Sequence, residues 1–194
     1  MPQSVVTPER YAKGFTFEEY TMQIKVNREH FSRFYQSGAL SADDALFFRE
    51  AAQLPNGFGK MMAIGEDWCP DAFRGLPVMA RIAEAAGVEL RIFPRDANMD
   101  IMNEFLNQGM YTSIPVAVFY TRDLKHLCHW IERPALANEE RARIEAEVKK
   151  EMAGATEQEV QLATRKRTQE RYPAWQQASV SEMRGMLAKA LGVS

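Results

Sequence analysis

The stretch Lys60-Met-Met-Ala-Ile-Gly-Glu-Asp-Trp-Cys-Pro-Asp-Ala-Phe-Arg-Gly-Leu76 decides the fold. Its apolar part ends at Gly65, and a polar turn then leads through Cys69 into Pro70. Proline suits the first position of a helix, because it has no N–H to leave unpaired there. The stretch therefore predicts a strand, a turn, a cysteine at the N-cap and a helix. Since free amides and the helix dipole favour a thiolate at a helix start, Cys69 is the candidate nucleophile.

Composition limits the class of protein. The 194 residues are 46% hydrophobic and 26% charged, with a formal net charge of −2, which is typical of a single soluble domain. A balanced charge gives no electrostatic reason to expect nucleic acid or a membrane as partner, and no run approaches the ~18 apolar residues of a membrane span. Only two cysteines, Cys69 and Cys128, are present, which fits a reducing, cytoplasmic setting and leaves a single disulfide open.

Two helices are expected before the first strand. A capping box that begins at Thr16 predicts a helix of about five turns, which ends at Gly38. Ser41 can cap a second helix, and Pro55 ends it. The residues before Thr16 are expected to be irregular. Residues 1–57 therefore form an N-terminal helical extension in this interpretation.

Strands and helices then alternate. The expected elements, in order, are strand 60–64, helix 70–86, strand 88–93, helix 99–106, strand 116–120 and strand 124–131. Crossover helices imply parallel pairing of the early strands, and the short turn at residues 121–123 predicts an antiparallel hairpin. The fold class is therefore α/β with a mixed central sheet, and its core is expected at residues 58–153.

Charged helix-forming residues dominate after Pro134. One helix is expected up to a break near Gly154, a second begins with a capping box at Thr156, and a third begins at Ser179. The C-terminal helices, 154–194, complete an expected single domain, 1–194. They pack back on that domain or pair with a second copy, which would give a homodimer. The basic run 165–167 is interpreted as a solvated helix face without a function.

These motifs resemble the thioredoxin superfamily, and more narrowly the bacterial thioredoxin-like proteins whose active site reads Trp-Cys-Pro-Asp-Cys. Residues 68–71 read Trp-Cys-Pro-Asp between the expected strand and helix, and Ile114 and Pro115 precede a strand as the cis-proline of that family does. The resemblance implies a three-layer sandwich in which Cys69 attacks a disulfide and a cis Pro115 lies beside it. It also implies a set of substrate-binding residues: Trp68, Pro70, Asp71, Ala72, Ile114 and Pro115.

Ala72 departs from the pattern of that family. The second cysteine of the family stands three residues after the first, on the same helix face, and resolves the mixed disulfide. Alanine cannot do so. One hypothesis is single-cysteine exchange at Cys69 on a protein disulfide or a glutathionylated protein, with glutathione as co-substrate and no other cofactor. The alternative is a redox-inactive module that binds an extended peptide or a partner protein. Cys128 is interpreted as a buried apolar residue rather than as a resolving thiol.

Other chemistries have weaker support. His126, Cys128 and His129 are potential metal ligands, but a strand periodicity of two places His126 and Cys128 on one face and His129 on the other. No metal site is therefore expected. No hydrolase motif surrounds Cys69, and no phosphate-binding loop is present in the sequence.

Overall fold

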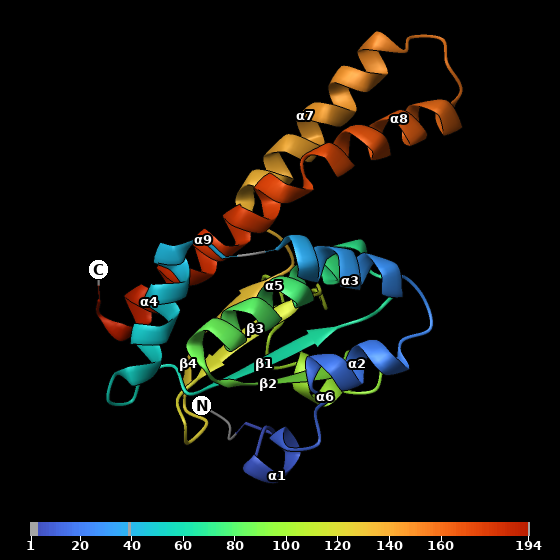
Figure 1. Cartoon of the computed structure of the whole chain (residues 1–194). Coiled ribbons are helices and arrows are strands. Elements are labelled where there is room, and N and C mark those ends of the chain that lie inside the picture. Colours follow the sequence, from blue (N-terminus) through green and yellow to red (C-terminus); the bar gives the residue numbers. More distant parts are fainter. Residues whose placement is uncertain (1–3, 39, 194) are drawn as a thin grey trace.

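A mixed four-stranded sheet forms the middle layer of the computed structural model, which describes residues 4–38 and 40–193 (Figure 1). The strands are β1 (Lys60–Gly65), β2 (Glu89–Pro94), β3 (Val116–Tyr120) and β4 (His126–Ile131), in the spatial order β2-β1-β3-β4. β1 is parallel to β2, and the β3–β4 pair is antiparallel. The predicted α/β class with a mixed sheet is confirmed.

The prediction that a second crossover helix keeps the strands parallel is wrong, because β3 runs antiparallel to β1. The helix between β2 and β3, α6 (Met99–Met102), is a single turn rather than the predicted 99–106. Gly65 pairs with Pro94 and Ile64 pairs with Val116, so β2 ends and β3 begins at the same end of the sheet. The connecting segment stays at that end, and the chain therefore re-enters the sheet in the opposite direction.

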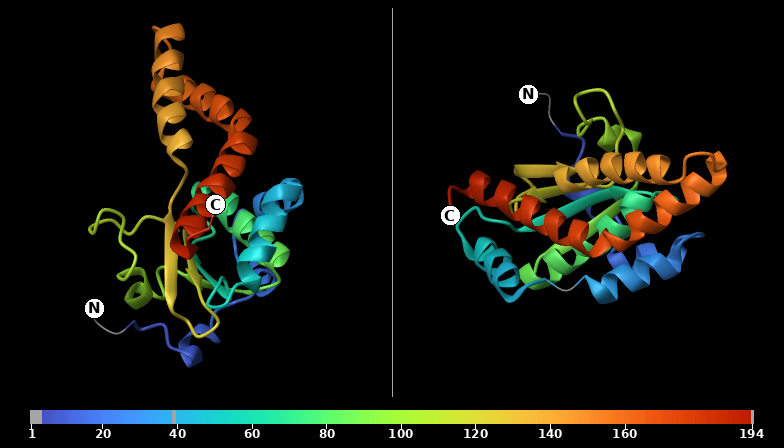
Figure 2. Two further views of the ribbon diagram at one scale, coloured as in Figure 1. Left: turned by 90° about the vertical axis from the view of Figure 1, so that its left-hand side faces the viewer. Right: turned by 90° about the horizontal axis from the view of Figure 1, so that it is seen from above.

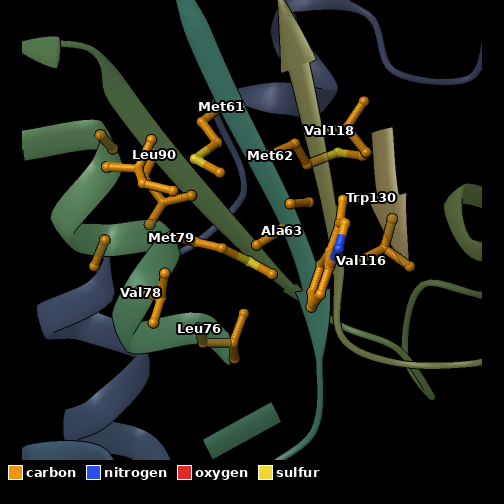
Figure 3. Packing of buried hydrophobic residues seen from close by; sticks show 14 of the residues in the cluster. Met61, Met62, Ala63, Leu76, Val78, Met79, Leu90, Val116, Val118 and Trp130 are labelled. Atoms are coloured by element: carbon orange, nitrogen blue, oxygen red, sulfur yellow. The ribbon is translucent and has the colours of Figure 1, made fainter. Parts of the chain in front are cut away.

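Helices cover both faces of the sheet (Figure 2). On one face lies α5 (Pro70–Ala86), whose predicted bounds are confirmed and which continues through Pro77. Figure 3 shows Met79 extending from α5 toward the strands, where Ala63 is completely buried. The opposite face is covered by α6 and by the segment that follows it, which includes the buried Phe105. The candidate cysteine therefore begins a helix that is fixed along its length by the central core.

The predicted five-turn helix near the N-terminus is wrong. The chain instead forms α2 (Phe17–Gln23) and α3 (Arg28–Ser37), separated by a segment in which Asn27 has a φ of 59°. Two backbone N–H groups between the helices donate to the Asp67 carboxylate at 2.8 and 3.2 Å. Their hydrogen bonds go to the turn before Cys69 instead of to a preceding helical turn, and a local periodicity cannot reveal such a contact.

The remaining N-terminal elements are α1 (Pro8–Tyr11) and α4 (Ala42–Gln53). α4 begins after the predicted N-cap, Ser41. α1 was not predicted, and its Tyr11 hydroxyl lies within hydrogen-bond distance of the backbone carbonyls of Met61 and Glu89, at 2.9 and 2.8 Å. The irregular start is therefore wrong for this segment, while residues 1–3 lie outside the described residues. This buried tyrosine anchors the N-terminal extension to the ends of two strands.

Three helices follow β4: α7 (Ala135–Glu151), α8 (Glu157–Glu170) and α9 (Tyr172–Leu191). The capping box at Thr156 is confirmed, but the predicted helix start at Ser179 is wrong. Pro173 lies in the first turn of α9, and the Ser179 hydroxyl donates to the Trp175 carbonyl within the helix at 2.9 Å. A serine can bond to the carbonyl four residues earlier inside a helix, so its presence does not mark a start. α9 packs against β4 and α5.

Together, α7 and α8 form a helical hairpin, here called the arm, that projects from the body of the protein (Figures 1 and 2). None of the α8 residues is buried. The base of the arm is held by the buried Glu140 of α7, which accepts hydrogen bonds from Arg171 Nε at 2.9 Å and Trp175 Nε1 at 2.6 Å. Across the described residues, no helix is long and apolar enough to cross a membrane.

Candidate active site

Cys69 is the N-cap residue of α5, with φ −85° and ψ 121°, and Pro70 occupies the first helical turn. Its Sγ–H donates to the Ile114 carbonyl at a distance of 3.7 Å. The peptide bond between Ile114 and Pro115 is cis. Because β1 and β3 are adjacent and antiparallel, the turn that follows β1 lies beside the residues that precede β3. The sheet topology therefore brings together Cys69, Ile114 and Pro115, which are far apart in the sequence.

Other predicted site residues differ in accessibility. Trp68 is 50% exposed, and the Arg95 guanidinium lies 5.0 Å from its ring centroid. Ala72 is completely buried.

Sequence reasoning missed Gly75, where a Cβ atom would lie only 2.7 Å from Pro115 Cγ. A glycine within a predicted helix was the available signal, since it permits the close approach of α5 to the Pro115 segment.

Asp71 is a buried carboxylate among arginines. It pairs with Arg74 of the same helix, with Arg133 at 3.0 Å and more distantly with Arg141 of α7 at 3.8 Å. The Arg74 guanidinium also lies 4.2 Å from the ring centroid of Tyr172. The resemblance named Asp71 only as a substrate-binding residue. In the structure it also connects the first turn of α5 to the segment that begins the arm.

Several groups act on the protonation of Cys69. Burial is the largest influence and raises the pKa of the thiol above its ordinary value. Hydrogen bonding from the backbone of Ala72 and Asp71 opposes this effect, while the Asp71 carboxylate adds to it and the Arg74 cation opposes it. The helix start does stabilise a thiolate, as expected, but burial outweighs that stabilisation in this site. Near neutral pH, Cys69 is therefore predominantly a thiol.

This balance predicts a pH profile for the reactivity of Cys69. The alkylation rate by iodoacetamide should keep rising to about pH 9 or beyond, because only the thiolate reacts and the thiol pKa is raised. Asp71→Asn should shift the profile to lower pH, since it removes a negative charge near the sulfur. Intact mass against time, in a Cys128→Ala background, gives the rates. A wild-type rate that levels off below about pH 7 would contradict the role of burial.

Cys128 does not serve as a resolving partner in this fold. Both cysteines are free, and burial raises the pKa of the Cys128 thiol to about 12. Cys128 of β4 pairs with Phe119 of β3, and Phe119 pairs with Met61 near the start of β1. Cys69 lies at the other end of the sheet, because it follows the last residue of β1. The four steps from Met61 to Gly65 correspond to ~13 Å, and a disulfide requires Cα atoms within ~7 Å. Cys128 is half-buried rather than buried as predicted, and it packs against the core.

The two histidines of β4 lie on the same face, contrary to the prediction. His126 Nε2 and His129 Nδ1 are 3.1 Å apart. A register shift at this point of the β3–β4 pair, in which Phe119 pairs with Cys128 but Tyr120 pairs with His126, breaks the expected alternation. Within residues 4–38 and 40–193, no group of three or more His, Cys, Asp or Glu side chains is placed to hold a metal ion.

A pocket of about 620 Å³ lies beside the candidate nucleophile, between the start of α5 and the arm. Its lining includes Trp68, Pro70 and Asp71 from the cysteine motif, and Arg141, Lys149 and Arg165 from the arm. Sequence reasoning did not place Arg165 near the site. The arm begins more than 60 residues after the motif, so only the tertiary structure brings these side chains together.

Comparison with known proteins supports the fold. A family model described as thioredoxin matches residues 14–146. The chain matches no curated protein. It is similar to the crystal structure of a protein of unknown function from Pseudomonas aeruginosa, with 14% identity and a TM-score of 0.64 over 95% of this chain and 99% of that chain. An HIV epitope scaffold is also similar, with 14% identity and a TM-score of 0.62 over 97% of this chain and 100% of that chain. These two likenesses concern the fold alone.

Proposed function

Because the chain belongs to the thioredoxin family, we propose that it carries out single-cysteine thiol–disulfide exchange at Cys69. The observation that carries this proposal is the meeting of the Cys69 sulfur with the Ile114 carbonyl, 3.7 Å away, at the start of α5. A single thiol is proposed because Ala72 occupies the position of a second cysteine and Cys128 lies far along the sheet.

The proposed reaction has two exchange steps. The Cys69 thiolate attacks one sulfur of a protein disulfide, or of a glutathionylated protein thiol, and the other sulfur leaves as a thiolate. A mixed disulfide with Cys69 remains. The thiolate of an external small thiol, such as glutathione, then attacks the sulfur bound to Cys69, forms a new disulfide with it and releases the Cys69 thiolate. When Cys69 carries a glutathionyl group, the product is oxidised glutathione; when it carries a protein, a second external thiol reduces the protein–glutathione disulfide to the protein thiol and oxidised glutathione. Glutathione is the proposed co-substrate, and the cytoplasm is the proposed setting.

The structure supports different contacts for the proposed substrate-binding residues. Trp68, which is half exposed, offers apolar area to a partner, while Pro115 and the buried Ile114 form the wall of the site next to the sulfur. Asp71 is proposed to act through its arginine partners, because its carboxylate is buried. Pro70 and Ala72 shape the turn around Cys69.

A second candidate function is a redox-inactive module that binds an extended peptide or a partner protein. Two observations favour it: the pKa of the Cys69 thiol is raised by burial, and the residue three positions later is alanine. In this alternative the cysteine packs against Ile114, and the adjacent pocket serves binding without exchange. Pairing of two copies through the terminal helices also remains a proposal, which light scattering would test.

Incubation with oxidised glutathione distinguishes the two candidates. Exchange predicts one glutathione adduct on Cys69, formed faster at higher pH and removed by added reduced thiol, because the thiolate is the attacking species. Intact mass and peptide mapping measure the adduct. Cys69→Ser should form none, and Cys128→Ala should react as the wild type does. If the wild type gives no adduct at Cys69, or one that thiols cannot remove, single-cysteine exchange is ruled out.

A further inference from the structure

The pocket beside Cys69 continues along the inner side of the arm and is here called the arm groove. On α7, Arg141, Glu145 and Lys149 line it at intervals of four residues, so they share one helix face. The distance along α7 from Arg141 to Lys149 is ~12 Å, which is the length of about four residues of extended chain. The arm groove therefore has the length to hold a short extended segment that approaches the cysteine motif.

The charges that line the arm groove are unevenly matched. Five arginine or lysine side chains line it, against three carboxylates, namely Asp71, Glu145 and Glu157. Asp71 engages Arg74 and Arg133 closely, and Glu145 binds Lys149 at 2.6 Å. The lining is therefore positively charged overall, although its acidic residues neutralise part of that charge.

The least neutralised cations come from the two helices of the arm, one from α7 and one from α8. Among the described residues, Asp71 is the one carboxylate within 4.0 Å of Arg141 on α7, at 3.8 Å, and it is shared with two closer arginines. Arg165 on α8 has no carboxylate within 4.0 Å among the described residues. His30, which also lines the arm groove, has a pKa lowered first by burial and then by nearby Arg33 and Arg165. The two arginines therefore line the arm groove and are the least neutralised of its cations.

The construction of α8 also points to a binding role. None of its residues is fully buried, although it packs against α7, whose Ile144 and Val148 are buried. Its Val160, Thr164 and Arg165 line the arm groove, while Glu140 at the base fixes the hairpin to α9. A projecting hairpin that contributes little to the core, and that presents cations toward a cysteine motif, is suited to hold an anionic chain.

We propose that the arm groove binds an acidic segment of the partner protein that meets Cys69. The carboxylates of that segment pair with Arg141 and Arg165, and its extended backbone runs along α7 toward Trp68. This inference rests on the function proposed for Cys69 where it names an exchange substrate, since it assigns that substrate an acidic sequence next to its reacting sulfur. The recognition itself depends only on charge and shape.

Binding can be measured without any thiol chemistry. The probes are two fluorescein-labelled, cysteine-free octapeptides, one rich in Asp and Glu and the other with Asn and Gln in their place. Fluorescence anisotropy with the full chain should show binding of the acidic peptide at least about ten-fold tighter, with a preference that weakens as salt is added. Equal affinity for the two peptides overturns the proposal.

Matched double variants test the location of the charge. Arg141→Gln/Arg165→Gln should reduce the preference for the acidic peptide to about two-fold or less, because the two least neutralised cations are lost. The control Lys150→Gln/Lys166→Gln removes the same charge from exposed positions of the same two helices, outside the arm groove, and should keep the preference. If both variants lose the preference for the acidic peptide equally, the assignment of binding to the arm groove is wrong, since net charge alone would then explain it. Displacement by excess reduced glutathione would overturn the assignment to a peptide.

An exchange assay separates failure of this inference from failure of the proposed function. Both peptides are made with one glutathionylated cysteine, and release of glutathione is followed. Faster transfer from the acidic peptide than from the neutral one supports both proposals. Binding of the acidic peptide without transfer supports the proposed role of the arm groove and contradicts exchange at Cys69. Transfer at equal rates from both peptides supports exchange and overturns the acidic specificity.

Discussion

Replacing Ala72 by cysteine should increase the turnover of a model disulfide, with dithiothreitol as reductant, on the order of 100-fold, because the second thiol would then be intramolecular. Residues 69 and 72 lie three positions apart at the start of α5 and share a face. The introduced thiolate can attack the mixed disulfide on Cys69, which forms an internal disulfide and releases the substrate thiol. The oxidised variant should lose two hydrogens in mass and resist alkylation at both positions.

Two controls define the meaning of this result. Ala72→Ser adds a side chain of similar size without a thiol and should show no gain, which separates resolution from a packing change at a fully buried position. Cys69→Ser combined with Ala72→Cys should be inactive, because the attacking sulfur is gone. If both thiols of Ala72→Cys react with iodoacetamide but turnover does not rise, the site lacks the geometry for exchange. That result would favour the alternative function, a redox-inactive module that binds a peptide or a partner protein.

The sequence contained enough information for the central part of the fold. The apolar run that ends at Gly65, followed by Cys69 and Pro70, predicted both a strand and a helix start, and the structure has them at those places. Such signals are local: each depends on the backbone preference of one residue or on a short apolar period. Local signals could therefore be interpreted without knowledge of distant contacts.

Features that depend on distant contacts were wrong or missing. The long N-terminal helix is divided because Asp67 binds the backbone between α2 and α3, and the histidines meet because the β3–β4 register shifts. The resemblance to a known family led to Ile114 and Pro115, since no spacing rule connects them to Cys69. Burial of the Cys69 thiol, which raises its pKa, also follows from packing that spacing does not show.

Asp71 links the two proposals made for this chain. Its carboxylate raises the pKa of Cys69, and it also pairs with Arg133 and Arg141 at the entrance of the arm groove. An acidic segment that draws Arg141 away would leave more of the Asp71 charge unneutralised. The reactivity of the thiol and the occupation of the arm groove are therefore connected through one side chain, which makes the position of the arm relevant to chemistry at Cys69.

Glu140→Ala should destabilise the protein and loosen the arm, because Glu140 is the buried anchor between α7 and α9. Its carboxylate accepts hydrogen bonds from Trp175 Nε1 at 2.6 Å and from Arg171 at 2.7 and 2.9 Å. Arg171 is 43% exposed and can turn to solvent, so most of the cost comes from the buried Trp175 N–H that loses its acceptor. We expect a loss of about 2 kcal/mol in the free energy of unfolding and a fall of about 5 °C in melting temperature.

Acid should reduce the effect of this substitution. Hydrogen bonding from Arg171 is the main cause that lowers the pKa of Glu140 below its ordinary value of 4.5. A lowered folded-state pKa stabilises the protein above the unfolded pKa, and this stabilisation is lost as the pH falls through the folded pKa. The difference between wild type and Glu140→Ala should therefore be largest near neutral pH and shrink in acid, as measured by urea unfolding. Glu139→Ala, at an exposed neighbouring position, should change stability little. An equal loss in both variants would show that helix α7, rather than the buried carboxylate, determines the stability of this junction.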